Sequence, residues 1–235
     1  GLDIKFPHHE SEIAQQESLS GKKLFVKIWM HSGLVMINGE RMAKSLGNFV
    51  RIRDFLQKHS VNVLRFIVAA AHYRSPINYD EHLVEQAENA LGTLEDFIIR
   101  LDLIKDKGEI SETLKESLRS REKSFIESMN NDFNTPEAIA ALFLVVNDYQ
   151  EKIWRLNKNE TGAIKDFITK KLNIFGIVFK RPTVPSQIKM LVKKRKSLRQ
   201  EKKFNEADLL RDKIEVLGFK IEDTPVGPLI QKKVS

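Results

Sequence analysis

Two side chains near the start of the sequence have the chemistry and spacing of metal ligands. His8 and Glu12 stand four residues apart, so a helix entered after Pro7 would place an imidazole and a carboxylate on one face, within reach of one Zn²⁺ ion. The same residues also suit a polar helix start, because acidic side chains are favoured near a helix N-terminus. Two ligands do not complete a zinc site, so we expect a metal here to need further ligands from residues that precede Gly1.

A basic loop bounded by glycines follows at residues 39–48. It carries Arg41 and Lys44 between Gly39 and Gly47. Such a loop can bring cationic side chains and backbone N–H groups to a phosphate, where they stabilise negative charge as it moves during a reaction. A solvated surface turn with two basic residues is at least as common, so residue chemistry alone leaves both interpretations open.

The third candidate is a basic segment between Ser186 and Asn205. It holds eight positive side chains and a single acidic residue, Glu201. Several cations on one helix can neutralise several phosphates of a nucleic acid at once, with little dependence on sequence. A solvated charged helix is the alternative. The cations are Lys189, Lys193, Lys194, Arg195, Lys196, Arg199, Lys202 and Lys203.

The elements that must position these groups follow from periodicity and turn signals. A helix is expected at about residues 10–18, followed by an extended run at 34–37. Asn38-Gly39 is a strong turn signal, since both residues tolerate positive φ, and it indicates either a hairpin or a strand leaving the sheet. Apolar residues then recur at helical spacing within 83–101 and 138–146. Asn134 or Thr135 is the expected N-cap of the latter helix, with Pro136 at its first position. These stripes predict a bundle of antiparallel helices.

The sequence predicts a small separate unit at the C-terminal end. Pro182 and Pro185 interrupt the helical pattern, and we expect helices at 186–203 and 206–217, a C-cap at Gly218 and short extended pieces at 219–221 and 229–230. The fold class is therefore mainly α with a small α/β C-terminal unit. We predict three domains, at residues 1–60, 61–181 and 182–235.

The composition and the charge distribution limit the classes of protein that fit this sequence. The chain of 235 residues is 41% apolar and carries a formal charge of +7. Residues 180–235 hold 15 basic and 7 acidic side chains. The basic excess therefore belongs to the C-terminal part and favours a polyanion partner.

There is no cysteine, which excludes disulfides and leaves only His and carboxylates for a metal. No run approaches a membrane span. The start lacks an apolar leader and an initiator Met, so we expect the chain to be part of something longer.

The sequence resembles the cysteinyl-tRNA synthetase family along its whole length. The family's usual forms FPHHENEIAQ and KMSKSLGNF match residues 6–15 and 41–49, with Arg41 in place of the first lysine and Ala43 in place of the first serine. The resemblance covers only about the C-terminal half of the family; the HIGH motif and the two zinc-binding cysteines have no counterpart here. Further matching blocks are Trp29 to Gly33, Leu64 to Phe66, His72 to Ile77, Met129 to Pro136, Glu206 to Asp212 and Ile221 to Gly227.

The resemblance implies an architecture and a reaction. It implies the end of a class I Rossmann-type catalytic domain, then the helical bundle, then an anticodon-binding unit. The reaction is ATP-dependent activation of L-cysteine followed by transfer to the tRNA for cysteine. A cytoplasmic, monomeric enzyme without a membrane partner is expected, and this chain alone is expected to be inactive.

The resemblance also implies residue roles. Lys44 and Arg41 would be catalytic and, with Ser45, would bind ATP, whose phosphates Mg²⁺ shields. His8 and Glu12 would be two ligands of a zinc ion whose other ligands are the two missing cysteines, and which binds the substrate thiolate directly. Binding of tRNA would fall to Lys193, Lys194, Arg195, Arg199 and Arg211, with Phe204 and Phe219 as candidates for stacking on anticodon bases.

Other assignments stay open at this stage. His31 lies in a matching block, so it either acts as a ligand or contacts the adenylate, or it is a buried, satisfied histidine. Trp29 is expected to be a packing residue.

Two other functions are also compatible with parts of the sequence. One is a related ligase that joins cysteine to an amino sugar, against which the basic tail argues; the other is a tRNA-binding protein without catalysis. A HIGH motif and two cysteines upstream of Gly1 would favour the synthetase.

Overall fold

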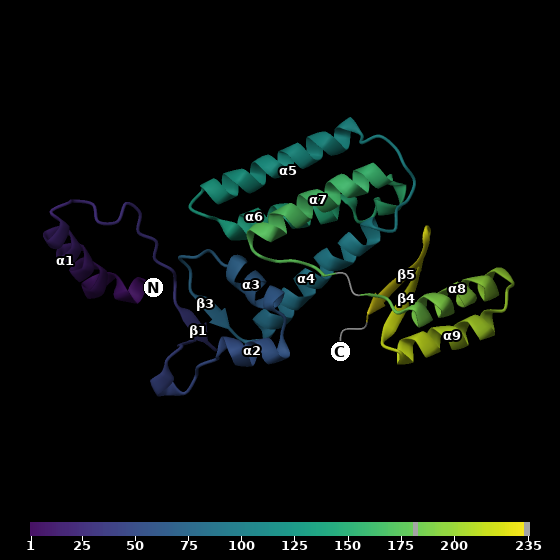
Figure 1. Ribbon diagram of the computed structural model, residues 1–235, viewed down its shortest axis with the longest axis horizontal. Helices are drawn as coiled ribbons and strands as arrows, with labels where there is room; N and C mark the ends of the chain where they lie inside the picture. The colour runs from purple at the N-terminus through teal and green to yellow at the C-terminus, as the bar shows by residue number, and fades with distance from the viewer. Residues whose placement is uncertain (181–182, 233–235) are drawn as a thin grey trace.

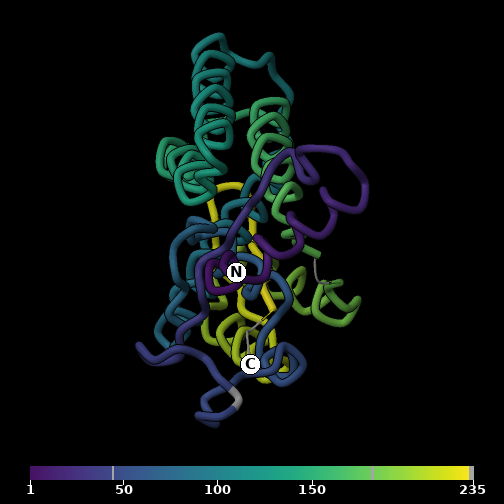
Figure 2. Tube along the Cα trace, turned by 90° about the vertical axis from the view of Figure 1, so that its left-hand side faces the viewer, coloured from purple at the N-terminus to yellow at the C-terminus, as the bar shows by residue number. Residues whose placement is uncertain are grey.

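The computed structural model describes residues 1–180 and 183–232, apart from the side chain of Lys44. An N-terminal arm, a helical body and a C-terminal helix–hairpin unit follow one another along the long axis of the molecule (Figure 1). Seen from the arm's end, the first residues and α1 (Glu10–Ser20) loop out in front of the helical body (Figure 2). Helix α1 ends at Gly21, whose φ of +66° suits a residue without a Cβ.

A small sheet joins the arm to the helical body. Its order is β2 (Glu40–Arg41), β1 (Val35–Ile37), β3 (Ile77–Tyr79). Strands β1 and β2 form the predicted hairpin, with Met36 opposite Arg41, and Asn38 and Gly39 take φ values of +50° and +82° in its turn. Strand β3 pairs with β1 in parallel, so the chain between them must cross over through helices.

Six helices make the body of the molecule, and local sequence signals begin several of them. Ser60, Asp80 and Asn134 each accept a hydrogen bond from a backbone N–H in the first turn, as N-caps do. Asn134 is thus confirmed as the cap, with Pro136 in the first turn. The helices are α2 (Ile52–Lys58), α3 (Val61–Ala69), α4 (Glu81–Leu101), α5 (Glu112–Asn130), α6 (Thr135–Tyr149) and α7 (Lys158–Ile174).

One hydrophobic core holds these helices together. It runs from Phe55 to Ile177, and Leu94, Leu142 and Ile164 within it are completely buried. The apolar stripes read from the sequence at 83–101 and 138–146 are the buried faces of α4 and α6, which confirms a mainly helical fold.

The C-terminal unit has its own core. Helices α8 (Ser186–Gln200) and α9 (Phe204–Val216) pack beside the antiparallel hairpin β4 (Phe219–Thr224) and β5 (Gly227–Lys232). Its buried cluster contains Ile188, Val192, Ile214, Phe219 and Ile221 and is separate from that of the body. The division at 60 and 181 stays a prediction, and its second boundary falls at Arg181 and Pro182, outside the described residues.

A polar contact ties this unit to the helical body. Both terminal nitrogens of Arg100 on α4 lie 2.7 Å from the carboxylate oxygens of Glu222 on β4. Asp96 accepts from Arg100 Nε at 2.6 Å and also from the Gln231 amide of β5. Such a paired, two-pronged contact fixes orientation as well as distance.

Candidate functional site

The predicted phosphate-binding loop is closed by the side chain of Asn48. Its Oδ1 accepts from the backbone N–H of Ala43 at 2.9 Å, and its Nδ2 donates to the carbonyl of Arg41 at 3.1 Å. Between these anchors Lys44–Leu46 makes a single 3₁₀ turn, and Gly47 takes a φ of +67°. The loop therefore has a defined shape and starts directly from strand β2.

Two of the three side chains predicted to bind ATP, those of Arg41 and Ser45, lie within the described part of the structure. The Arg41 side chain is 60% exposed and donates from Nη2 to Asp3 Oδ2 at 2.8 Å. Ser45 is exposed, whereas the side chain of Lys44 lies outside the described residues. Neither Asp3 nor Asn48 was among the predicted site residues. Asn48 lies inside a matching block and was available as a signal, but nothing in the sequence joins Asp3 to Arg41, 38 positions away.

His8 and Glu12 lie where the chain enters α1, and their role as zinc ligands stays a prediction. His8 lies in the turn Lys5–His9 that leads directly into α1, and Glu12 lies in the first turn of that helix. Both side chains are exposed. In the described part of the chain no group of three or more metal-ligating side chains is close enough to hold an ion. Two such side chains would supply half of a tetrahedral zinc site and not a whole one.

Beside this pair, three aromatic rings from distant parts of the arm stack together. His9 and Trp29 stack with their ring centroids 4.9 Å apart, and His9 Nδ1 lies 2.9 Å from His31 Nε2. Loss of hydration and the neighbouring His9 lower the pKa of His31. His31 is therefore held by another histidine, and Trp29 packs as expected. The sequence leaves the role of His31 open and contains no signal that joins it to His9, 22 positions away.

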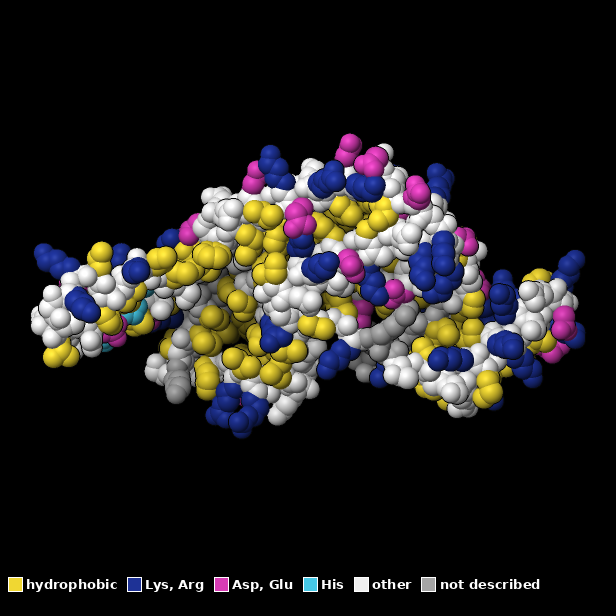
Figure 3. All heavy atoms as spheres, turned by 45° about the horizontal axis from the view of Figure 1, so that its top comes forward, with side chains coloured by type: hydrophobic (Ala, Val, Ile, Leu, Met, Phe, Trp, Pro, Cys, Tyr) yellow, Lys and Arg dark blue, Asp and Glu magenta, His cyan; other side chains and the backbone are white. Residues whose placement is uncertain are grey.

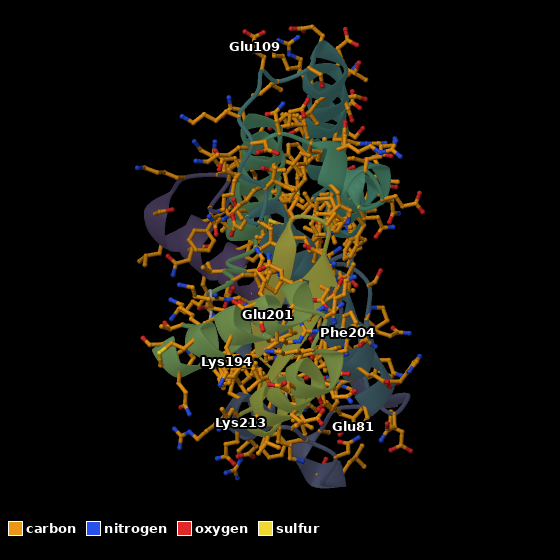
Figure 4. The ribbon with its side chains drawn as sticks, turned by 90° about the vertical axis from the view of Figure 1, so that its right-hand side faces the viewer. Glu81, Glu109, Lys194, Glu201, Phe204 and Lys213 are labelled. Atoms are coloured by element: carbon orange, nitrogen blue, oxygen red, sulfur yellow. The ribbon has the colours of Figure 1, made fainter. Side chains whose placement is uncertain are left out.

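The basic face of the C-terminal unit is smaller than the sequence suggested. Lys193 and Lys194 are exposed on α8. Figure 4 looks at this end of the molecule and shows Lys194 on α8 and Phe204 and Lys213 on α9, all three exposed to solvent. Phe204 is 53% exposed and keeps its face available for stacking.

Arg195 does not lie on that face. Its side chain is only 3% exposed, and its two terminal nitrogens donate to the two oxygens of Asp223 at 2.7 and 2.8 Å. The prediction that Arg195 contacts tRNA is therefore wrong, because its guanidinium is buried in an ion pair within the unit. Phe219, 8% exposed, is likewise a core residue and not a stacking platform.

The remaining predicted cations are accessible. Arg199 is 43% exposed and lies 3.4 Å from Asp223, and Arg211 is 45% exposed with its Nε 3.8 Å from Glu215. An open cleft between α8 and the β4–β5 turn is lined by Lys196, Arg199 and the residues from Thr224 to Pro228, among others. Two exposed basic side chains of α8, Lys196 and Arg199, thus line one side of a concave surface at the end of the hairpin.

Comparison with known proteins assigns the class first. Residues 1–89 match the family described as the tRNA synthetases class I (C) catalytic domain, and residues 124–180 match the DALR domain. The structure resembles that of the ternary complex of Agrobacterium radiobacter K84 LeuRS with tRNA and LeuAMS, with a TM-score of 0.59 over 74% of this chain and 25% of that one, at 17% identity. At that identity the likeness shows the fold alone. The chain thus has the fold and domains of a class I tRNA synthetase.

Curated relatives narrow the class to one family. The cysteine–tRNA ligase of Thermococcus onnurineus is 38% identical over 251 aligned residues, which cover 100% of this chain and 52% of that protein. That of Caldicellulosiruptor saccharolyticus is 38% identical, covering 99% of this chain and 51% of its own length. The chain belongs to the cysteine–tRNA ligase family, and it spans about half the length of the curated relatives it matches. No helix in the described ranges is long and apolar enough to cross a membrane.

Proposed function

We propose that this chain serves the ATP-dependent activation of L-cysteine and its transfer to the tRNA for cysteine. The observation that carries the proposal is the Asn48-closed loop, which presents Arg41 and the Lys44–Leu46 turn at the end of a strand. The family assignment supports this reading, and no observation favours the amino-sugar ligase or a binding protein without catalysis.

In this proposal the loop acts on the phosphates of ATP. Arg41 is exposed and its partner Asp3 is itself one-third exposed, so a phosphate can replace Asp3 at little cost. Lys44 supplies an ammonium and Ser45 a hydroxyl from the 3₁₀ turn, and Mg²⁺ accompanies the nucleotide as part of the substrate. These groups stabilise the charge that develops as cysteine displaces pyrophosphate.

The proposal includes a zinc site of which this chain supplies only two ligands. His8 and Glu12 would supply a nitrogen and an oxygen ligand from one helix start, and the other ligands would come from outside this chain, which has no cysteine. When bound, the metal would offer the substrate thiolate a soft-ligand position that a hydroxyl fills poorly. The neighbouring His9, Trp29 and His31 rings would shape the wall of that site.

The C-terminal unit would bind the tRNA. Lys193, Lys194 and Arg199 are exposed and suit phosphate contacts, which position a nucleic acid without reading its sequence. Arg211 and the exposed ring of Phe204 suit splayed, single-stranded bases. We place the enzyme in the cytoplasm as a monomer.

The deciding experiment compares two lysine variants of the full-length enzyme. Lys44→Ala should slow cysteine-dependent exchange of pyrophosphate into ATP by about a hundredfold to a thousandfold, because a donor aimed at transition-state charge is lost. Lys58→Ala removes an exposed lysine at the end of α2 and should leave the exchange rate unchanged. Equal rates for Lys44→Ala and the parent would assign the phosphate contact to Arg41 or to the loop backbone. Absence of any cysteine-dependent exchange in the full-length parent would refute the proposed function.

A further inference from the structure

Four polar side chains join the helical body to the C-terminal unit. Arg100 Nη1 and Nη2 donate to the two carboxylate oxygens of Glu222, each at 2.7 Å. Asp96, one turn earlier on α4, accepts from Arg100 Nε at 2.6 Å and also from the side-chain amide of Gln231. Helix α4 therefore contacts both strands of the hairpin through one connected network. We refer to these four residues as the latch.

The latch lies on one face of the hairpin. Glu222 is paired with Leu229 in the register, and Gln231 follows two residues later on β5, so these three side chains stand on the same face of the sheet. Leu229 is 1% exposed, so this face is covered. The hydrogen bonds from Arg100 lower the pKa of Glu222, which keeps its carboxylate charged near neutral pH.

The ion pair within the latch is partly shielded from water. The side chains of Arg100 and Glu222 are 23% and 40% exposed. An isolated pair on a protein surface contributes little, but a two-pronged pair within a hydrogen-bonded network holds its geometry. The latch therefore restrains the angle between α4 and the hairpin as well as their distance.

Apolar packing does not by itself fix how the two parts are oriented. The buried cluster of the C-terminal unit and the core of the helical body share no residue. Figure 1 shows the hairpin beside the C-terminal end of α4, with α8 and α9 on its far side. Parts of a chain that are joined without a large apolar interface move relative to each other by default. Specific contacts such as those of the latch are what can hold them in one arrangement.

We propose that Arg100 is a positioning residue for tRNA, because through the latch it holds the C-terminal unit in one orientation to the helical body before the tRNA binds. The inference deepens the proposed function and rests on it for the identity of the ligand. Lys and Arg side chains lie over the C-terminal unit, at the right-hand end of the molecule in Figure 3. The Asn48-closed loop lies at the other side of the helical body, between β2 and α2 (Figure 1).

A tRNA that contacts both sites has to span the helical body. Fixing the orientation of the unit in advance removes the entropy cost of ordering it on binding. It also raises the effective concentration of the second contact once the first has formed. Loss of the latch should therefore weaken the binding of a whole tRNA and leave the binding of a short RNA, which touches only the C-terminal unit, unchanged.

The first experiment measures the orientation directly, without any ligand. The chain has no cysteine, so Glu116→Cys on α5 and Leu209→Cys on α9, both at exposed sites, place two spin labels for double electron–electron resonance. We expect one narrow distribution of distances in the labelled parent. Arg100→Met and Glu222→Gln should each broaden it by about twofold or more. The double variant should be no broader than either single variant, because the two side chains act through one contact.

A second arginine provides the matched control. Arg121 on α5 donates to Asp148 on α6 at 2.8 Å, and the two side chains are 28% and 38% exposed. This pair resembles that of Arg100 and Glu222 in exposure but lies wholly within the helical body. Arg121→Met should therefore leave the label distances unchanged. Circular dichroism should show the same helix content in all variants.

The second experiment uses the full-length enzyme and separates binding from chemistry. Arg100→Met and Glu222→Gln should raise the KM for the tRNA for cysteine by about tenfold. The kcat of charging and the cysteine-dependent exchange of pyrophosphate into ATP should stay within about twofold of the parent, since the latch touches none of the reacting groups. The affinity for the isolated anticodon stem–loop should also stay within about twofold, because the RNA-binding face of the unit is intact.

Four results would overturn the inference. They are label distances that Arg100→Met leaves unchanged, a distribution as broad in the parent as in the variants, equal weakening of stem–loop and whole tRNA, and tighter binding of whole tRNA by the variants. The last would mean that the latch holds the unit away from its working position. The label distances require neither ATP nor tRNA, so this result is distinct from a failure of the proposed function, which would appear as absent exchange in the parent.

Discussion

The ion pair between Arg195 and Asp223 makes a prediction about the C-terminal unit that depends on which partner is removed. The Arg195 side chain is 3% exposed and the Asp223 side chain 48% exposed. Arg195 Nε has no hydrogen-bond partner, so the guanidinium depends on Asp223 for both of its hydrogen bonds in this pair. The free energy of unfolding should therefore depend on which of the two side chains is removed.

Removing Asp223 should cost more than removing Arg195. Asp223→Ala leaves a guanidinium buried without its main counterion, and loss of one partner of a fully buried pair costs about 3–5 kcal/mol. Since the carboxylate end is half exposed, we expect about 2–3 kcal/mol for this unit. Arg195→Met fills a similar volume with an apolar stem, and the remaining carboxylate is already close to water, so the cost should be about 0–1 kcal/mol.

Native-state hydrogen exchange of the full chain measures both costs. The hydrogen-bonded amides of the β4–β5 hairpin, whose Ile221 and Leu229 are buried, report the opening free energy of this unit. A difference of about 2 kcal/mol between the variants corresponds to roughly a thirtyfold difference in the opening equilibrium. Asp212→Ala, at an exposed site on α9, is the matched control and should open like the parent. Equal destabilisation by Arg195→Met and Asp223→Ala would refute the reasoning, because it would mean that the charge is not what needs the partner.

Three further predictions concern binding and pH. Replacing Lys193 and Lys194 by alanine should weaken all tRNAs similarly and reduce the slope of log K against log salt by about two units at most; an unchanged slope would make them a solvated surface. Titration of this chain with Zn²⁺ in a calorimeter should show only weak binding, since two ligands leave most of the binding energy unrealised, and sub-micromolar binding abolished by His8→Ala would reveal ligands within the chain that the structure does not bring together. The hydrogen bond from Arg74 lowers the pKa of Asp132 to about 2, so their contact should be stable above about pH 4 and be lost as the pH falls through about 2; NMR of the Arg74 side chain follows it, and Asp132→Asn should abolish the transition.

Helix positions could be predicted because their signals are local. The cap at Asn134 and the apolar stripe of α4 act within a few residues of the chain, so a spacing of 3.6 residues and a cap define them without knowledge of the rest. The Asn38-Gly39 turn was predictable for the same reason, since both residues tolerate the positive φ that the structure shows.

The buried position of Arg195 does have a local signal in the sequence. It stands on the stripe Ile188, Val192, Arg195, Leu198, which is the buried face of α8. This spacing indicates a side chain that points inward, whereas the positive charge indicates one at the surface. A buried arginine needs a carboxylate partner, and Asp223 lies 28 positions further on, where no local pattern points to it.

The sequence by itself determined the family and the helices, because motif identity, periodicity and capping are properties of neighbouring residues, and it predicted which residues act on phosphate, metal and tRNA. Only the tertiary structure decided which of those residues are accessible and what holds them. Asn48 closes the loop, Asp3 pairs with Arg41, His9 meets His31, and Asp223 takes Arg195 out of the basic face. The Asp3–Arg41, His9–His31 and Arg195–Asp223 contacts join positions 38, 22 and 28 residues apart, so pairing and accessibility depend on the path of the whole chain, whereas periodicity and capping act between neighbouring residues.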